Sequence, residues 1–158
     1  MDLPQRKVIR LKDYDYSSNG AYYVTICVVG RHNILGKIAV GANCVRPLLS
    51  EIGCIIENEI PILSNTYDCV FIDKYIIMPN HIHMIILIVK DGRTEFAPTL
   101  SRVIKQFKGS ITKQIGFSVW EKSFNDRIIR NMDEYKRIWH YIDNNPAKWA
   151  EDEYYENI

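Results

Sequence analysis

Long hydrophobic runs are missing from this sequence of 158 residues. No apolar stretch approaches the roughly 20 residues that a membrane-spanning helix needs, and the beginning of the chain holds no apolar core of a signal peptide. Internal repeats, low-complexity tracts and linkers are also absent. We therefore expect one domain over residues 1–158, located in the cytoplasm and without a membrane partner.

Paired cysteines of the kind that bind zinc or build disulfide frameworks are missing as well. The four cysteines show no CxxC spacing, and Cys27 and Cys54 stand within apolar runs. We interpret these cysteines as small buried side chains in a reducing compartment. The content of 47% hydrophobic and 25% charged residues is that of an ordinary globular protein, so composition excludes the fibrous and disordered classes.

A large charge of one sign is also absent, since the net charge of +1 by itself indicates no nucleic-acid partner. The charge is distributed unevenly, however. Residues 101–140 hold nine Lys and Arg against four acidic residues, whereas residues 141–158 hold one against five. A basic stretch of this size could follow a phosphate backbone, but on charge alone a solvated helix face is the simpler explanation.

Hydrophobic periodicity predicts an alternation of strands and helices. Runs of β-branched and aromatic residues predict strands, and apolar residues at every third or fourth position predict helices. The predicted strands are 21–29, 33–41, 69–78, 81–89 and a short strand within 119–130, and the predicted helices are 46–63, 99–116 and 131–146. We predict that Pro47 lies in the first turn of the first helix and that this helix ends near Pro61. We also predict that Asn131 caps the last helix.

The order of these elements predicts the fold class. A strand, a helix, a hairpin, a second helix, a strand and a last helix form an α+β, ferredoxin-like split βαβ pattern. We therefore expect an antiparallel sheet with helices on one face and with a late helix near the end of the chain.

The stretch "MPNHIHMIILIV" (78–89) places two histidines in a run that otherwise reads as a strand. His81 and His83 share one face of that strand because side chains alternate, and the opposite face continues with apolar residues such as Met84. Such a pair more often consists of two polar side chains that are hydrogen-bonded within the protein and bind no metal. Buried imidazoles nevertheless need partners, and a metal ion is one that both can share.

The last predicted helix offers further groups. Tyr141 and Asn145 are four residues apart, so they lie one above the other on the flank of the apolar stripe. Two imidazoles with an amide oxygen suit Mg²⁺ or Mn²⁺, and a phenol is a useful nucleophile toward a phosphate polarised by a metal. Ten tyrosines are present, and the residues alone do not select Tyr141 among them.

The stretches "MPNHIHMII", "SFNDRIIR" and "YIDNNPAKW" resemble the single-tyrosine HUH transposases, and most closely the REP-associated tyrosine transposases. The HUH signature is a histidine, a bulky apolar residue and a histidine, and here it reads His81-Ile82-His83. The resemblance extends to residues 9–28 and 101–113, so it covers nearly the whole chain. The signature alone is weak, but it becomes specific when Y-I-x-x-N-P follows in the last predicted helix.

This resemblance implies a single HUH transposase-like domain over residues 1–158, with Tyr141 as the catalytic residue on the late helix. It implies that His81, His83 and Asn145 hold a divalent metal, Mg²⁺ or Mn²⁺. The expected reaction is the cleavage and rejoining of single-stranded DNA through a 5′-phosphotyrosine intermediate, as in DNA transposition. The expected partner is a single-stranded DNA hairpin, and both a monomer and a homodimer are open.

With a DNA partner, we predict phosphate contacts by Arg102, Lys105 and Lys108 on the helix 99–116. Two other functions remain as alternatives. One is a domesticated, non-catalytic protein that binds DNA hairpins on the same scaffold. The other is a small metal-dependent phosphoesterase, which would use the metal but would not depend on Tyr141.

Overall fold

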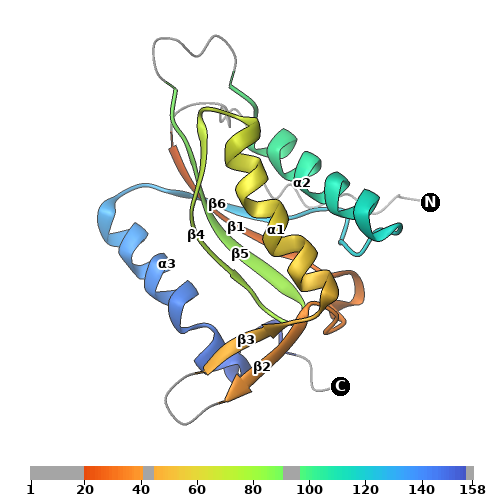
Figure 1. Ribbon diagram of the computed structural model, residues 1–158. Helices are drawn as coiled ribbons and strands as arrows, with labels where there is room; N and C mark the ends of the chain where they lie inside the picture. The colour runs from red at the N-terminus through yellow and green to blue at the C-terminus, as the bar shows by residue number, and fades with distance from the viewer. Residues whose placement is uncertain (1–19, 41–44, 91–96, 156–158) are drawn as a thin grey trace, which may run out of the picture.

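The computed structural model describes residues 20–40, 45–90 and 97–155, which build an antiparallel sheet with helices packed around it (Figure 1). The sheet has the strand order β4-β5-β1-β6, made of β4 (Val70–Ile77), β5 (His81–Ile88), β1 (Gly20–Cys27) and β6 (Asn125–Ile129). A separate two-stranded sheet pairs β2 (Gly36–Val40) with β3 (Val45–Leu49). The helices are α1 (Glu51–Thr66), α2 (Leu100–Ile115) and α3 (Met132–Asn144), and the 3-10 turns are η1 (Val29–Arg31) and η2 (Pro146–Glu151).

This topology confirms the predicted α+β, ferredoxin-like class. Apart from the small β2–β3 sheet, the chain runs β1-α1-β4-β5-α2-β6, which is two interleaved βαβ units. The register pairs Thr25 of β1 with His83 of β5, and Cys27 with His81. The histidines therefore lie on a central strand, whose backbone is hydrogen-bonded to neighbours on both sides.

One face of the sheet forms the main hydrophobic core against α1 and α2. Its side chains alternate along the two central strands because the period of a strand is two residues. The fully buried members are Tyr22, Val24 and Ile26 of β1 and Ile82, Met84, Ile86 and Ile88 of β5. Each buried side chain of this size contributes roughly 1.5–3 kcal/mol to folding, so this layer holds the sheet in place.

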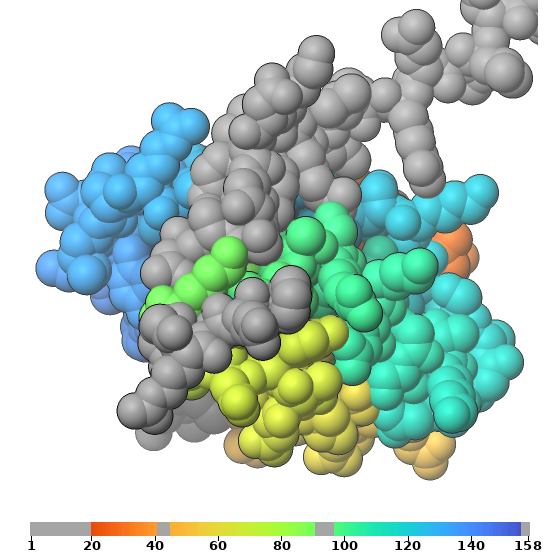
Figure 2. All heavy atoms as spheres, turned by 90° about the horizontal axis from the view of Figure 1, so that it is seen from above, coloured from red at the N-terminus to blue at the C-terminus, as the bar shows by residue number. Residues whose placement is uncertain are grey.

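The opposite face carries a smaller apolar cluster together with the histidine pair. Ile85 of β5 and Ile129 of β6 form this cluster with Ile138 and Ile142 of α3. Figure 2 shows α1 and α2 on one side of the molecule and α3 on the other. The predicted layer on one face therefore consists of α1 and α2, whereas the late helix α3 covers the face that the histidines share.

The first helix begins and ends later than predicted. Pro47 lies in β3, and the helix starts after Ser50, whose hydroxyl accepts a hydrogen bond from the Gly53 N–H at 3.1 Å. A serine side chain caps a helix directly, so Ser50 is the stronger start signal. The helix also continues past Pro61. A proline removes only one helical donor, and burial of Leu63 in the core holds the final turns in place.

The last helix starts at its predicted cap. The Asn131 side chain accepts a hydrogen bond from the Glu134 N–H at 2.8 Å, and the Glu134 carboxylate accepts one from the Arg130 N–H at 3.0 Å. The first bond satisfies a donor that the first turn of a helix leaves free, and the second ties the residue before the cap to that turn. These bonds also fix the phase of α3, in which Ile142 points into the cluster and Tyr141 lies on its flank.

The cysteines follow the prediction only in part. Cys27 is a buried free thiol as expected, but Cys54 is exposed on α1, because the neighbouring Ile56 side of that helix faces the core. Cys44 lies outside the described residues, as does the part of the sequence resemblance carried by residues 9–19. Within the described ranges, no helix combines the length and apolar character that crossing a membrane requires.

Candidate active site

Two buried imidazoles face each other on β5. His81 and His83 are 0% and 1% exposed, and their Nε2 atoms lie 3.0 Å apart. Two ring nitrogens at this distance can share either a proton or a cation. The pair is therefore compatible both with a hydrogen-bonded chain of polar side chains and with a metal site.

Each imidazole is oriented through its Nδ1 atom. His81 Nδ1 donates a hydrogen bond to Asn80 Oδ1 at 2.8 Å, which leaves a lone pair on Nε2 of His81. His83 Nδ1 lies 2.8 Å from the Thr25 hydroxyl and 2.9 Å from the Tyr23 hydroxyl. Since a hydroxyl can donate or accept, either tautomer of His83 finds a partner at Nδ1, and the tautomer with its proton on Nδ1 leaves the Nε2 lone pair available to a metal. Histidines that ligate metals are usually held by outer partners of this kind.

Burial keeps both imidazoles neutral. It lowers the pKa of His81 to about 4, although the nearby charge of Asp152 and, after it, a contact with Asn145 oppose this shift. Burial also lowers the pKa of His83, and a charge on His81 would lower that pKa further. At neutral pH both rings are thus uncharged, which is the state that metal coordination requires of an imidazole.

Helix α3 brings the tyrosine and the amide to the histidine pair. The ring centroid of Tyr141 lies 5.6 Å from that of His83, and Tyr141 is 43% exposed, so its phenol borders both the pair and solvent. Asn145 is 2% exposed, and its Oδ1 atom is buried without a hydrogen-bond partner. A buried oxygen without a partner is unfavourable, and a cation beside it would satisfy it. The donor set therefore fits a divalent ion.

Asp152 is a member of this site that the sequence analysis missed. Its carboxylate forms a group with His81 and His83 in which the ligand atoms all lie within 4.8 Å of one another. Among the residues that the structure describes, this is the one group of three His, Cys, Asp or Glu side chains placed to share a metal ion. Asp152 follows η2 in an acidic segment, and no sequence signal distinguishes it from its acidic neighbours.

The tyrosine is electrostatically coupled to the same acidic segment. Burial, followed by the charges of Asp152 and Glu153, raises the pKa of Tyr141, while its contact with Asn145 acts in the opposite direction. The phenol is therefore protonated at neutral pH. Any reaction in which it attacks an electrophile must remove that proton.

The Asn80 side chain forms hydrogen bonds with His81 and with two segments that lie beside it. Its side-chain amide donates hydrogen bonds to the backbone carbonyls of Arg31, at 3.1 Å, and Tyr154, at 2.7 Å. The Tyr154 ring in turn lies against His81, with 4.5 Å between the ring centroids, and the Arg31 guanidinium lies 4.9 Å from the centroid of the Tyr154 ring. From the sequence alone Asn80 is assigned only to a turn, although its position directly before His81 is a usable signal.

Replacing Asn80 with alanine is expected to lower both stability and metal affinity. The change leaves one buried carbonyl group, one part-buried carbonyl group and the His81 N–H without partners, so the free energy of unfolding should fall by about 3 kcal/mol. Loss of the group that orients His81 should weaken Mn²⁺ binding by about 10- to 100-fold. Urea denaturation and calorimetric titration with Mn²⁺ measure the two effects.

The matched control is Asn144→Ala, which removes the same side chain from an exposed position at the end of α3. It should change neither quantity appreciably. If Asn80→Ala bound Mn²⁺ as tightly as the unaltered protein, the orienting role of Asn80 would be wrong.

The predicted phosphate contacts lie away from this cluster. Arg102 and Lys105 are exposed on α2, which packs against the other face of the sheet. The Lys108 ammonium donates to the backbone carbonyls of Glu121, at 2.9 Å, and Ser123, at 3.0 Å. Helix α2 therefore contributes nothing to the histidine and tyrosine site, and its contacts with DNA stay a prediction.

The fold of the chain is that of known transposase structures. A REP-associated tyrosine transposase bound to a REP hairpin is similar over 88% of this chain and 73% of its own, with 20% identity and a TM-score of 0.65. A candidate transposase from Deinococcus radiodurans is similar over 85% of this chain and 95% of its own, with 14% identity and a TM-score of 0.51. The predicted resemblance to the REP-associated tyrosine transposases is thereby confirmed for the fold.

In sequence, the chain is similar to an uncharacterized protein of Haemophilus influenzae. The two are 31% identical over 171 aligned positions, which cover 95% of this chain and 93% of the relative. The chain belongs to the same family as this Haemophilus protein. No protein-family model matches the chain.

Proposed function

We propose that this chain is a single-tyrosine HUH DNA strand-transferase, which cleaves and rejoins single-stranded DNA as in DNA transposition. The observation that carries the proposal is the position of Tyr141, whose phenol borders the buried His81 and His83 pair. A phenol beside two neutral imidazoles and an unpartnered amide oxygen provides a nucleophile and a metal site together. The likeness to a transposase bound to a hairpin supports the same function.

In the proposed cleavage step, the Oη atom of Tyr141 attacks a phosphodiester phosphorus of the DNA. The bond between phosphorus and the 3′ oxygen breaks, and the phosphate stays on the tyrosine as a 5′-phosphotyrosine. The proton that the phenol gives up balances the proton that the leaving 3′ oxygen takes on. In rejoining, a 3′-hydroxyl attacks the phosphotyrosine and releases Tyr141, so no ATP is consumed.

We assign the divalent ion, Mg²⁺ or Mn²⁺, to His81, His83 and Asn145. When bound, it supplies polarisation of the scissile phosphate. The protein's own contribution is to hold these ligands rigidly, through Asn80 and through the hydroxyls on His83, and to place the phenol at the open side of the site. Preorganisation of this kind favours attack because the reacting groups are already in position.

For the substrate we propose a hairpin-bearing single strand of DNA. Arg102, Lys105 and Lys108 would then contact phosphates from α2, at a distance from the cleavage site. Both a monomer and a homodimer stay open for this reaction. A homodimer would have to preserve the arrangement of the nucleophile and the proposed ligands or exchange α3 between its subunits.

A covalent-adduct assay tests the proposal. The protein is incubated with Mn²⁺ or Mg²⁺ and single-stranded hairpins from the flanks of its own gene, labelled at either end, and is run on a denaturing gel. The 3′ label should move with the protein, and the 5′ label should appear in a free fragment that ends in a 3′-hydroxyl. Removal of the metal with EDTA should prevent both products.

Other outcomes would assign a different function. Hairpin binding without an adduct would contradict the enzymatic proposal and would favour a domesticated, non-catalytic hairpin-binding protein. An adduct that carries the 5′ label would contradict the proposed polarity of cleavage. Metal-dependent hydrolysis of simple phosphodiesters without any hairpin binding would instead favour the phosphoesterase.

A further inference from the structure

The ligands assigned above carry no charge, and the structure places one carboxylate beside them. We propose that Asp152 is a further ligand of the divalent ion and that Asn145, besides its own oxygen, positions the Asp152 carboxylate. This inference rests on the proposed function, because it concerns the same metal site. It assigns a role to the turn after η2, which follows the tyrosine helix in the chain.

The geometry of the carboxylate supports this role. A ligand oxygen of Asp152 lies within 4.8 Å of a ring nitrogen of both His81 and His83. Two ligands on opposite sides of one Mg²⁺ or Ca²⁺ ion are about 4 to 5 Å apart, since each bond is about 2.0–2.6 Å long. The three side chains can therefore reach a common ion with little movement.

The Asp152 carboxylate is also held in a fixed orientation. Asn145 Nδ2 donates a hydrogen bond to Asp152 Oδ2 at 2.6 Å, and the Tyr154 N–H donates to Oδ1 at 2.8 Å. Each carboxylate oxygen has lone pairs beyond the one used in these bonds. Outer hydrogen bonds of this type are typical of carboxylates that ligate metals.

Asn145 has a double role in this arrangement. Its amide nitrogen donates to Asp152, and its Oδ1 atom is buried without a hydrogen-bond partner. A cation between the imidazoles, Asp152 and this oxygen would satisfy the unpartnered atom. The carboxylate is the one formally charged member of this ligand set, and hard oxygen ligands favour Mg²⁺ and Mn²⁺ over softer metals.

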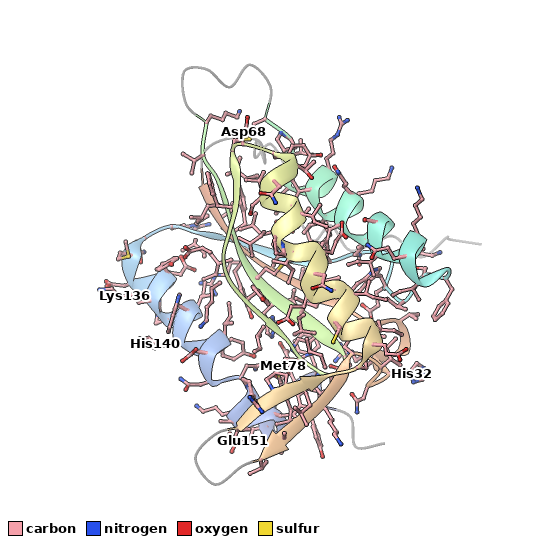
Figure 3. All side chains as sticks on the ribbon, in the orientation of Figure 1. His32, Asp68, Met78, Lys136, His140 and Glu151 are labelled. Carbon is pink, nitrogen blue, oxygen red and sulfur yellow. The ribbon has the colours of Figure 1, made fainter. Side chains whose placement is uncertain are left out.

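The test measures Mn²⁺ binding by calorimetry, without DNA and without an activity readout. Asp152→Asn keeps an acceptor for the Tyr154 N–H but removes the charge, and it should weaken Mn²⁺ binding at least about tenfold. The matched control is Glu151→Gln, which makes the same charge change at the exposed neighbouring end of η2, labelled in Figure 3, and should leave the affinity unchanged. Circular dichroism checks that both variants are folded.

A second variant tests coordination directly. Asp152→Cys places a soft thiolate at the same position, so Cd²⁺ should produce a thiolate charge-transfer absorption in the difference spectrum against the unaltered protein. Glu151→Cys should produce none. This measurement stays informative if Asp152→Asn is poorly folded, because it depends on the appearance of a new signal.

The outcomes separate this inference from the proposed function. If His81→Ala abolishes Mn²⁺ binding while Asp152→Asn binds normally and Asp152→Cys gives no absorption, Asp152 is not a ligand and the proposed function is untouched. Equal weakening by Asp152→Asn and Glu151→Gln would also overturn the inference, since it would reflect general charge. If the unaltered protein binds no Mn²⁺, both the inference and the proposed metal site are wrong.

Discussion

Replacing Tyr141 with phenylalanine is expected to reduce formation of the covalent protein–DNA adduct at least about a thousandfold. The change removes only the phenolic oxygen, which is the proposed nucleophile, and no other group at the site can form the same ester. Tyr141 is 43% exposed and lies on the flank of α3, so the ring stays in place and the fold should be unaffected. Binding of a hairpin should survive, because it depends on the surface of the protein and not on the phenol.

The matched control is Tyr75→Phe. Tyr75 lies on β4 and its hydroxyl donates to Glu57 of α1, on the side of the sheet away from the histidines. This variant should form the adduct at the normal rate, measured on the same denaturing gel. An adduct that persists in Tyr141→Phe would show that another residue is the nucleophile, whereas loss of the adduct in both variants would indicate a general defect.

Addition of Mn²⁺ is expected to stabilise the fold. Binding to the native state alone stabilises a protein by about 2.7 kcal/mol when the free ion is at 100 times its dissociation constant. The native site places two neutral imidazoles and an unpartnered oxygen around one point, an arrangement that an unfolded chain does not keep. For a domain of this size the gain corresponds to roughly 5–10 °C in melting temperature.

Thermal melting with increasing Mn²⁺ measures this effect, and excess EDTA should reverse it. His83→Asn should melt at a temperature independent of Mn²⁺, because one of the two ring ligands is gone. His140→Asn is the matched control, because His140 lies exposed on α3, as labelled in Figure 3. This variant should show the same rise in melting temperature with Mn²⁺ as the unaltered protein. A shift of equal size in both variants would mean that the ion binds elsewhere.

The orientation of the histidine pair shows how far local rules reach. Alternation along a strand depends only on the backbone of that strand, so the sequence predicted correctly that His81 and His83 share one face and that Met84 lies on the other. The cap of α3 is equally local, because Asn131 bonds to a backbone group three residues away. The errors at Pro47 and Pro61 arose where weak local signals competed with a better cap and with burial.

The sequence by itself therefore determined the elements of the main sheet and its helices, the fold class and the face on which the histidines lie, but not the strand β3. The tertiary structure decided that α3 covers that face, and it brings to the pair Tyr141 and Asn145, which the residues alone did not select and the resemblance only implied. The tertiary structure also decided the partners of Asn80, which are the backbone carbonyls of the distant residues Arg31 and Tyr154. It likewise placed Asp152 beside the histidine pair. The reason is physical: secondary structure follows from dihedral preferences and periodicity of neighbouring residues, whereas a site assembled from a strand, a helix and a turn depends on packing between segments that the chain order does not place.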